Sequence, residues 1–195
     1  FIKKFNSNQS KETKDKKFKK IKNKLVLNRD LNLYIENVRQ QKIIAVTGTN
    51  GKSTTTKLIG DILKENKIEA FVGGNIGEPL CDAFIKDKKY NYHVIELSSF
   101  QLETIKNFNA DISIITNLSS DHLDRYDNIT DYINQKKNII TKIGVNLFSI
   151  DDKYSKKIYL QKKIKNKLSF SLQDQTADFY MGEGFILDNY FKKNR

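Results

Sequence analysis

The stretch Val46-Thr47-Gly48-Thr49-Asn50-Gly51-Lys52-Ser53-Thr54 decides how this chain folds. It follows an apolar run, Lys42 to Val46, that predicts a buried strand, and it leads into residues 55–63, whose spacing predicts a helix. Glycines in such a turn let backbone N–H groups approach phosphate oxygens. The start of the following helix adds partial positive charge and free donors. The sequence therefore predicts a loop that holds a polyphosphate.

Two side chains of this loop suit that chemistry. Lys52 can reach the terminal phosphates, and the Ser53 hydroxyl can contact Mg²⁺. The loop departs from the common G-x-x-x-x-G-K-[ST] pattern, which would need glycine where Val46 stands. It is a shorter G-x-x-G-K-S form. The alternative is an ordinary strand-to-helix turn with a hydroxyl cap.

Length and composition bound the class of protein. The 195 residues suffice for one well-packed domain with partial elements at its ends, and the start at Phe1 suggests a fragment or a processed chain. The single cysteine, Cys81, fits a reducing compartment, so we expect a cytoplasmic protein and a small buried apolar role for Cys81. No apolar run approaches the roughly 20 residues that span a membrane, and no signal peptide is evident.

The net charge of +12 is consistent with a solvated lysine-rich surface, with acidic substrates such as nucleotides, or with nucleic acid. Its densest run lies between Lys11 and Lys24. No basic stripe interleaved with aromatic residues supports nucleic-acid binding, so we expect neither nucleic acid nor a membrane as a partner. A non-catalytic nucleotide- or nucleic-acid-binding module remains the alternative from a different class.

From residue 42 onward, strand and helix patterns alternate. The expected strands are Ile43–Thr47, Glu69–Val72, Tyr92–Leu97, Asp111–Asn117 and Val145–Ile150, and the expected helices are Lys52–Asn66, Pro79–Lys86, Thr130–Ile143 and Lys153–Lys162. This rhythm predicts an α/β fold of the P-loop type, with a mostly parallel sheet flanked by helices. Residues 25–41 predict a short strand and a helix. The alternating runs 168–172 and 179–187 predict short antiparallel strands at the sheet edge.

Polar segments follow three of these strands, namely Gly73–Gly77, Glu96–Gln101 and Asn117–Arg125. In an open parallel sheet they would meet at the edge that carries the P-loop. Glu96 could ligate Mg²⁺ there, or could cap a helix.

Individual residues in and near these segments leave alternatives open. His122 could ligate a second metal or orient a substrate, or could be a surface residue. His93, inside an apolar strand, is interpreted as structural. The run Asn75-Ile76-Gly77 could contact a phosphate or sugar, or could be a loop that needs positive φ.

Taken together, the motifs resemble the Mur ligase family, the ATP-dependent amide-forming enzymes of peptidoglycan synthesis. The resemblance covers about residues 25–195 and is carried by the following segments: Thr47–Thr54, Gly73–Gly77, Glu96–Glu103 and Asp121–Arg125. It implies a monomeric enzyme that adds D-glutamate to UDP-N-acetylmuramoyl-L-alanine through an acyl phosphate. Another Mur ligase or a folylpolyglutamate synthetase is the alternative, against which the Glu96–Glu103 segment argues.

The resemblance also implies roles for single residues. ATP would be held by Gly48, Thr49, Asn50, Gly51, Lys52, Ser53 and Thr54. One Mg²⁺ would bind Ser53 and Glu96, and a second would bind Glu96 and His122, with a carbamylated lysine bridging toward it. Tyr132 and Ile139 frame Lys136 as that lysine, with Lys137 as the competitor. The catalytic set would be Lys52, Glu96, His122 and Lys136, and the substrate would meet Asn75, Ser98 and Gln101.

The family pattern has three domains, of which this chain would hold one in part. We expect a polar basic segment at 1–24, a remnant of the N-terminal UDP-binding domain at 25–41, and an incomplete central ATP-binding domain at 42–195. The domain that binds the amino acid would lie outside the chain. The isolated chain is therefore expected to bind nucleotide weakly and to form no amide bond.

Overall fold

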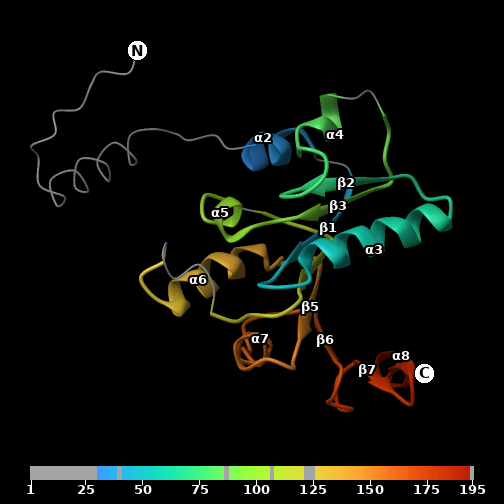
Figure 1. Ribbon diagram of the computed structural model, residues 1–195, viewed down its shortest axis with the longest axis vertical. Coiled ribbons are helices and arrows are strands. Elements are labelled where there is room, and N and C mark those ends of the chain that lie inside the picture. Colours follow the sequence, from blue (N-terminus) through green and yellow to red (C-terminus); the bar gives the residue numbers. More distant parts are fainter. Residues whose placement is uncertain (1–29, 39–40, 86–87, 106–107, 121–125, 194–195) are drawn as a thin grey trace, which may run out of the picture.

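The computed structural model describes residues 30–38, 41–85, 88–105, 108–120 and 126–193. These residues form an eight-stranded sheet in the order β2-β3-β1-β4-β5-β6-β7-β8 (Figure 1). The strands are β1 (Lys42–Thr47), β2 (Ala70–Gly74), β3 (Tyr92–Glu96), β4 (Ile112–Ile115), β5 (Val145–Ser149), β6 (Lys167–Ser171), β7 (Phe179–Gly182) and β8 (Phe185–Asp188). The expected basic segment at 1–24 and the short strand near Leu25 lie outside the described residues.

The predicted α/β class is confirmed, with one correction at the far edge of the sheet. Neighbouring strands from β2 to β7 pair in parallel, and only β7 with β8 pairs antiparallel. The antiparallel direction expected for residues 168–172 is therefore wrong. Helix α7 (Lys153–Tyr159) connects β5 to β6 as a crossover, which returns the chain in the same direction, whereas alternation of side chains carries no information about direction.

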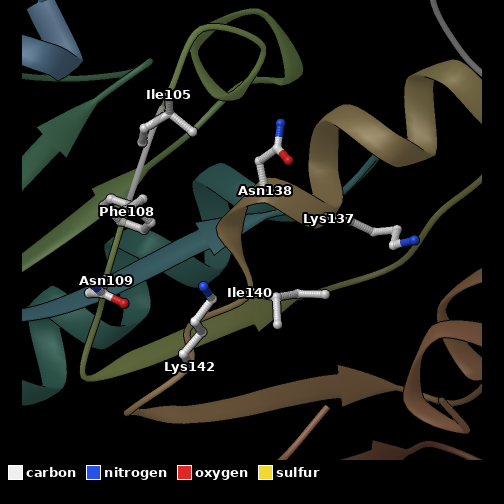
Figure 2. A pocket seen from close by; sticks show the side chains of 7 residues that line it. All are labelled: Ile105, Phe108, Asn109, Lys137, Asn138, Ile140 and Lys142. Carbon is white, nitrogen blue, oxygen red and sulfur yellow. The ribbon is translucent and has the colours of Figure 1, made fainter. Parts of the chain in front are cut away.

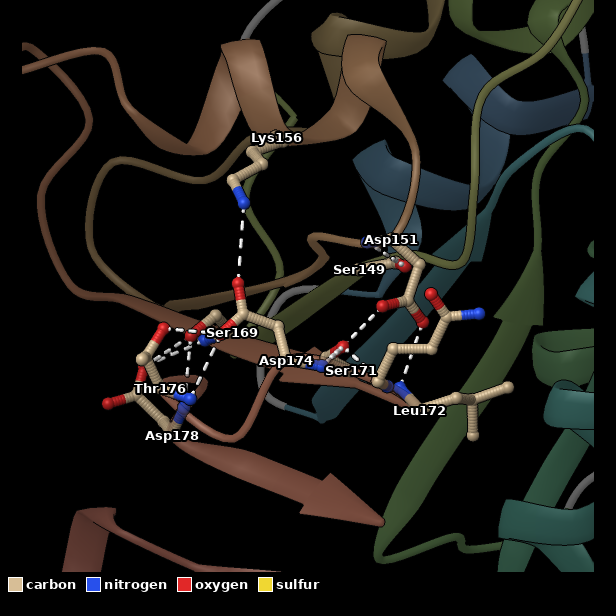
Figure 3. Close-up of polar contacts among 10 residues, drawn as sticks. Ser149, Asp151, Lys156, Ser169, Ser171, Leu172, Asp174, Thr176 and Asp178 are labelled. Atoms are coloured by element: carbon tan, nitrogen blue, oxygen red, sulfur yellow. Dashed lines mark hydrogen bonds and ion pairs between the residues drawn. The ribbon is translucent and has the colours of Figure 1, made fainter.

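Side-chain carboxylates fix the turn between β6 and β7 (Figure 3). Asp151 accepts hydrogen bonds from the Ser171 hydroxyl and from Leu172 N. Asp178 Oδ2 accepts from both the backbone and the hydroxyl of Ser169, each at 2.9 Å. These bonds tie the start of the turn to the segment after β5 and its end to β6, so the chain enters β7 beside β6 without a helical crossover.

The helices agree with prediction in position more than in length. They are α2 (Asp30–Asn37), α3 (Lys52–Glu65), α4 (Asp82–Ile85), α5 (Ser99–Leu102), α6 (Ile129–Lys136), a 3₁₀ turn η1 (Lys137–Ile139), α7 and α8 (Tyr190–Lys193). Helices α5 and α8 have four residues each, too few to leave a periodic pattern. No helix in the described part of the chain is long and apolar enough to cross a membrane.

The helix expected over 130–143 ends early at Lys136 and continues only as η1. The buried Asn146 side chain accepts a hydrogen bond from Thr141 N and donates one to Thr141 O. Gly144 also packs so closely on Ala110 that an added Cβ would lie 2.2 Å from the Ala110 carbonyl oxygen. These contacts hold residues 141–144 in a tight turn before β5.

The sheet separates two apolar cores. Ile43 and Ala45 of β1 face the larger core, which includes residues of α2, α4, α5 and α7. Ile44 and Val46 face the smaller core, which Ile59 of α3 covers. Figure 1 shows α3 on one side of the sheet and α5 and α6 on the other. The continuous apolar run of β1 thus reflects burial on both faces.

Two sequence expectations concern single side chains away from the P-loop. The structural interpretation of His93 is confirmed, since the residue is buried and its Nδ1 shares a 2.9 Å hydrogen bond with the Tyr34 hydroxyl of α2. The expectation of a buried Cys81 is wrong, because its side chain is half-buried. Its thiol points toward the Asp30 carbonyl at 3.9 Å, at the start of α2.

The His93 environment predicts a loss of stability in acid. Burial lowers the pKa of His93 from 6.5 to about 4, so the unfolded chain takes up a proton at a higher pH than the folded chain. The free energy of unfolding should therefore fall between pH 6.5 and pH 4, by roughly 2–3 kcal/mol. Urea titrations across this range measure the loss. A Tyr34→Phe/His93→Phe double variant should lack this component, and an identical pH dependence in both proteins would contradict the assignment.

Candidate functional site

The predicted phosphate loop lies at the carboxyl edge of the sheet, between β1 and α3. Strand β1 pairs with β3 on one side and with β4 on the other, so Val46 lies beside Glu96 and Ile114. Gly51 precedes α3 with a φ of 77°, in the left-handed region that glycine tolerates. Of the three polar segments singled out in the sequence, two begin in the last residues of β2 and β3, and the described part of the third follows β4. This is the edge where ligands bind in open parallel sheets.

Asn117, two residues after the end of β4, holds the loop in shape. Its Oδ1 accepts from Asn50 N and its Nδ2 donates to Asn50 O, both at 2.9 Å. Its backbone oxygen accepts from Thr49 N at 2.9 Å, and the neighbouring Thr116 hydroxyl donates to Asn50 O at 2.7 Å. Sequence reasoning missed Thr116 and Asn117 as single residues, although their place at the end of the strand beside β1 was a usable signal.

The remaining backbone donors of the loop face outward. Within the described ranges, no acceptor contacts the N–H groups of residues 51 to 54. The Lys52 amine folds back to donate to Thr49 O at 2.8 Å. Ser53 and Thr54 are exposed. Four consecutive amides at the start of a 14-residue helix, with an amine beside them, can bind an anion.

Glu96 is the carboxylate nearest this loop in the described structure, and it is 1% exposed. Ser53 Oγ donates to Glu96 Oε2 at 2.8 Å, and Asn75 Nδ2 donates to Glu96 Oε1 at 2.9 Å. Asn75 N also donates to the Glu96 carbonyl. The structure therefore brings together three predicted site residues, which come from β3, α3 and the segment after β2.

The oxygens of Ser53 and Glu96 fit a magnesium ion, which prefers hard oxygen ligands and usually takes one or two carboxylates plus phosphate oxygens and water. The described residues contain no group of three histidine, cysteine or acidic side chains placed to hold a metal by themselves. Most ligands of an ion at this edge would therefore come from nucleotide and solvent. His122, the other expected ligand, lies outside the described residues.

The two candidate lysines occupy different environments. Lys136, on α6, is buried, and its Nζ donates to Gly48 O at 2.8 Å and to Thr47 Oγ1 at 3.3 Å. Lys137 is half-buried and lines a cavity of about 260 Å³ near Phe108 and Lys142 (Figure 2). Burial lowers the pKa of Lys137, and the nearby Lys163 lowers it further. The geometry brings Lys136, not Lys137, to the phosphate loop.

Ser98 and Gln101 pair with each other at the start of α5. The Ser98 hydroxyl accepts from Gln101 N, and Gln101 Oε1 accepts from Ser98 N, which together form a capping box. The polar atoms expected to contact substrate thus have a structural use in the described chain. Their contact with substrate stays a prediction.

Comparison with known proteins gives these motifs a family. Residues 46–189 match the family described as the Mur ligase middle domain. The chain belongs to the Mur ligase family. It is 42% identical over 144 residues to the UDP-N-acetylmuramoylalanine–D-glutamate ligase of Rickettsia prowazekii, which covers 71% of this chain and 32% of that protein. The enzyme of the same name from Fusobacterium nucleatum is 44% identical over 151 residues, or 77% of this chain and 35% of that protein. The chain thus spans about a third of the length of these relatives.

Solved structures of the family share the fold. A UDP-N-acetylmuramoyl-L-alanyl-D-glutamate–2,6-diaminopimelate ligase aligns with a TM-score of 0.61 and 23% identity, over 79% of this chain and 37% of that one. The MurF ligase of Thermotoga maritima, in complex with ADP, aligns with a TM-score of 0.59 and 20% identity, over 96% of this chain and 44% of that one. At these identities the likeness concerns architecture alone.

The close packing of Gly48 predicts the effect of a single methyl group. A Cβ at Gly48, whose φ is +154°, would lie 1.9 Å from Thr116 Oγ1. Gly48→Ala should therefore displace the Thr116 side chain that contacts Asn50 and lower the free energy of unfolding by about 1–3 kcal/mol.

Gly184→Ala is the matched control, since Gly184 also has a positive φ but nothing lies within 4 Å of its added Cβ. Chemical denaturation of both variants measures the difference. A Gly48→Ala variant no less stable than Gly184→Ala would show that the close approach of the loop to β4 is wrong.

Proposed function

We propose that the protein containing this chain is an ATP-dependent ligase that adds D-glutamate to UDP-N-acetylmuramoyl-L-alanine and releases ADP and phosphate. The names of the relatives from Rickettsia prowazekii and Fusobacterium nucleatum support the substrates. One observation carries the chemistry: the buried Glu96 carboxylate contacts Ser53 at the start of α3, beside outward-facing backbone amides. A single cysteine and the nucleotide-linked substrate support a cytoplasmic location.

The phosphate loop would bind the ATP phosphates through the N–H groups of residues 51 to 54. Lys52 would turn its amine from Thr49 O toward the terminal phosphates, where its charge is needed as negative charge shifts during transfer. Phosphoryl transfer depends mainly on positioning and charge neutralisation. The loop needs no covalent side chain for this task.

Ser53 and Glu96 are the residues that would hold a magnesium ion, which supplies charge neutralisation at the phosphates when bound. For them to do so, the hydrogen bond between Ser53 Oγ and Glu96 Oε2 must open, since both atoms would turn to the ion. Asn75 Nδ2 would keep Glu96 Oε1 in place during that change. A second ion on Glu96 and His122 remains part of the proposal.

The substrate carboxylate would attack the γ-phosphorus of ATP, forming an acyl phosphate and releasing ADP. The amine of D-glutamate would then add to the acyl carbon, and phosphate would leave as the amide forms. Asn75 is exposed at the same edge and would meet the first substrate. Groups that position the amine would come from protein outside these 195 residues.

Lys136 is our candidate for carbamylation. The reaction would join CO₂ to the neutral Lys136 amine and release a proton. The end of the side chain would then carry a negative charge. The carbamate keeps one N–H on Nζ, which could still donate to Gly48 O, while its carboxylate would be available toward the phosphate edge. Its burial between α6 and the loop supports this choice over Lys137.

The substrate proposal predicts a defined specificity. The full-length protein should produce ADP with UDP-N-acetylmuramoyl-L-alanine and D-glutamate, but not when D-glutamate is replaced by L-alanine, meso-diaminopimelate or a folate. A coupled ADP assay, with product mass as confirmation, measures this. Preference for another amino acid would place the protein elsewhere in the family. Turnover by the 195-residue chain alone would contradict the proposed need for further domains.

The phosphate-loop proposal predicts the effect of Lys52→Ala. Loss of the amine should weaken binding of a magnesium–nucleotide complex about 10- to 100-fold, which is about 1.4–2.7 kcal/mol. Lys57→Ala is the matched control, because Lys57 is exposed farther along the same helix.

Calorimetry with ADP and with an oligonucleotide separates the functional classes. Equal ADP affinity in the two lysine variants would defeat the loop assignment. Salt-dependent oligonucleotide binding that Lys52→Ala leaves unchanged, without ADP binding, would favour a nucleic-acid module instead.

A further inference from the structure

Tyr132 is a fully buried side chain beside the phosphate loop, with an exposed fraction of 1%. It comes from α6, and its ring is fixed by other aromatic side chains. Tyr126 contacts it at a centroid distance of 5.5 Å, and Phe100 at the start of α5 stacks on Tyr126 at 6.2 Å and 24°. The ring of Tyr132 is therefore held in one position relative to the sheet.

The face of this ring lies against the amine of Lys136. The Lys136 Nζ is 4.9 Å from the ring centroid, within the range of a cation–π contact. The two residues are four apart on α6, so they lie on one face of the helix. The same amine donates to Gly48 O at 2.8 Å. The ring thus covers the side chain that contacts the first residue of the loop.

The hydroxyl of Tyr132 contacts the loop independently. It shares a hydrogen bond of 3.2 Å with Thr49 Oγ1, which in turn accepts from Ser119 N at 3.0 Å. Thr49 is 7% exposed, so this contact is made away from bulk solvent. A single side chain therefore joins α6, the phosphate loop and the segment after β4.

We propose that Tyr132 is a positioning residue whose ring orients Lys136 against Gly48 and whose hydroxyl fixes Thr49, so that the loop keeps the shape that binds nucleotide. This inference rests on the proposed function. It goes beyond that function in separating two tasks of one side chain. The hydroxyl sets nucleotide affinity through its bond to Thr49. The ring keeps the Lys136 side chain in place beside the loop.

Two substitutions in the full-length protein separate these tasks. Tyr132→Phe removes the hydroxyl and keeps the ring, so the KM for ATP should rise about 3- to 10-fold while kcat changes less than twofold. Tyr132→Leu removes both, so kcat should also fall about tenfold or more. A purely structural tyrosine behaves differently, because partial unfolding lowers the active fraction, and hence the apparent kcat, but leaves the KM for ATP unchanged.

Tyr34→Phe is the matched control, because Tyr34 is equally buried and its hydroxyl bonds to His93 away from the loop. It should lower stability in urea without changing the KM for ATP. Thr49→Val tests the partner: it removes the bond to Tyr132 and also the one from Ser119 N, so adding Tyr132→Phe should weaken ATP binding no further than Thr49→Val does alone.

If Tyr132→Phe binds ATP and ADP as tightly as the wild-type protein does, the inference is overturned and the proposed function stays intact. Fully additive effects of Thr49→Val and Tyr132→Phe would also overturn it. Failure of the unsubstituted protein to bind nucleotide would overturn the proposed function, and this inference with it.

Discussion

Strand β1 lies between β3 and β4, with all three strands parallel, and this pairing sets the geometry of the whole candidate site. It places Glu96 beside Val46 at the end of β3 and Asn117 within reach of Asn50 after β4. Each strand is buried on both faces by the two cores, so its end has little freedom to shift. The polar groups at the edge are therefore held by apolar packing below them.

The backbone N–H groups of the loop fall into two sets, one bonded within the protein and one available to a ligand. Thr49 and Asn50 donate their amides to Asn117, which fixes the first half of the turn. The amides of residues 51 to 54 meet no acceptor in the described chain and face the same edge as Glu96. An unpaired amide at a helix start carries no penalty while water reaches it, and it gains when an anion replaces that water. The loop amides can therefore bind a phosphate, and they cost no stability when only water contacts them.

Much of this could be predicted from sequence because the signals are local. The glycine-lysine-serine turn, the apolar strands and the polar strand ends each lie within about ten residues, and the rule for parallel sheets brings them to one edge. Predictions failed where long-range contacts decide. The direction of β6 and the role of Asn117 depend on partners 21 and 67 residues away, and the turn after α6 depends on the packing of Gly144 on Ala110. A single sequence offers no pattern for such contacts.

Lys136 and Lys137 also show what the sequence alone could not decide, namely which of two neighbouring lysines contacts the phosphate loop. Successive helical positions point about 100° apart, so the Lys136 amine reaches Gly48 O of the phosphate loop, whereas Lys137 lies at the cavity that Phe108 also lines. The most direct test of the account is a crystal structure of the protein with Mg²⁺ and a non-hydrolysable ATP analogue. We expect phosphate oxygens about 3 Å from the amide nitrogens of residues 51 to 54, with the Lys52 amine moved from Thr49 O to phosphate. A nucleotide bound elsewhere, with the loop amides still facing solvent, would contradict it.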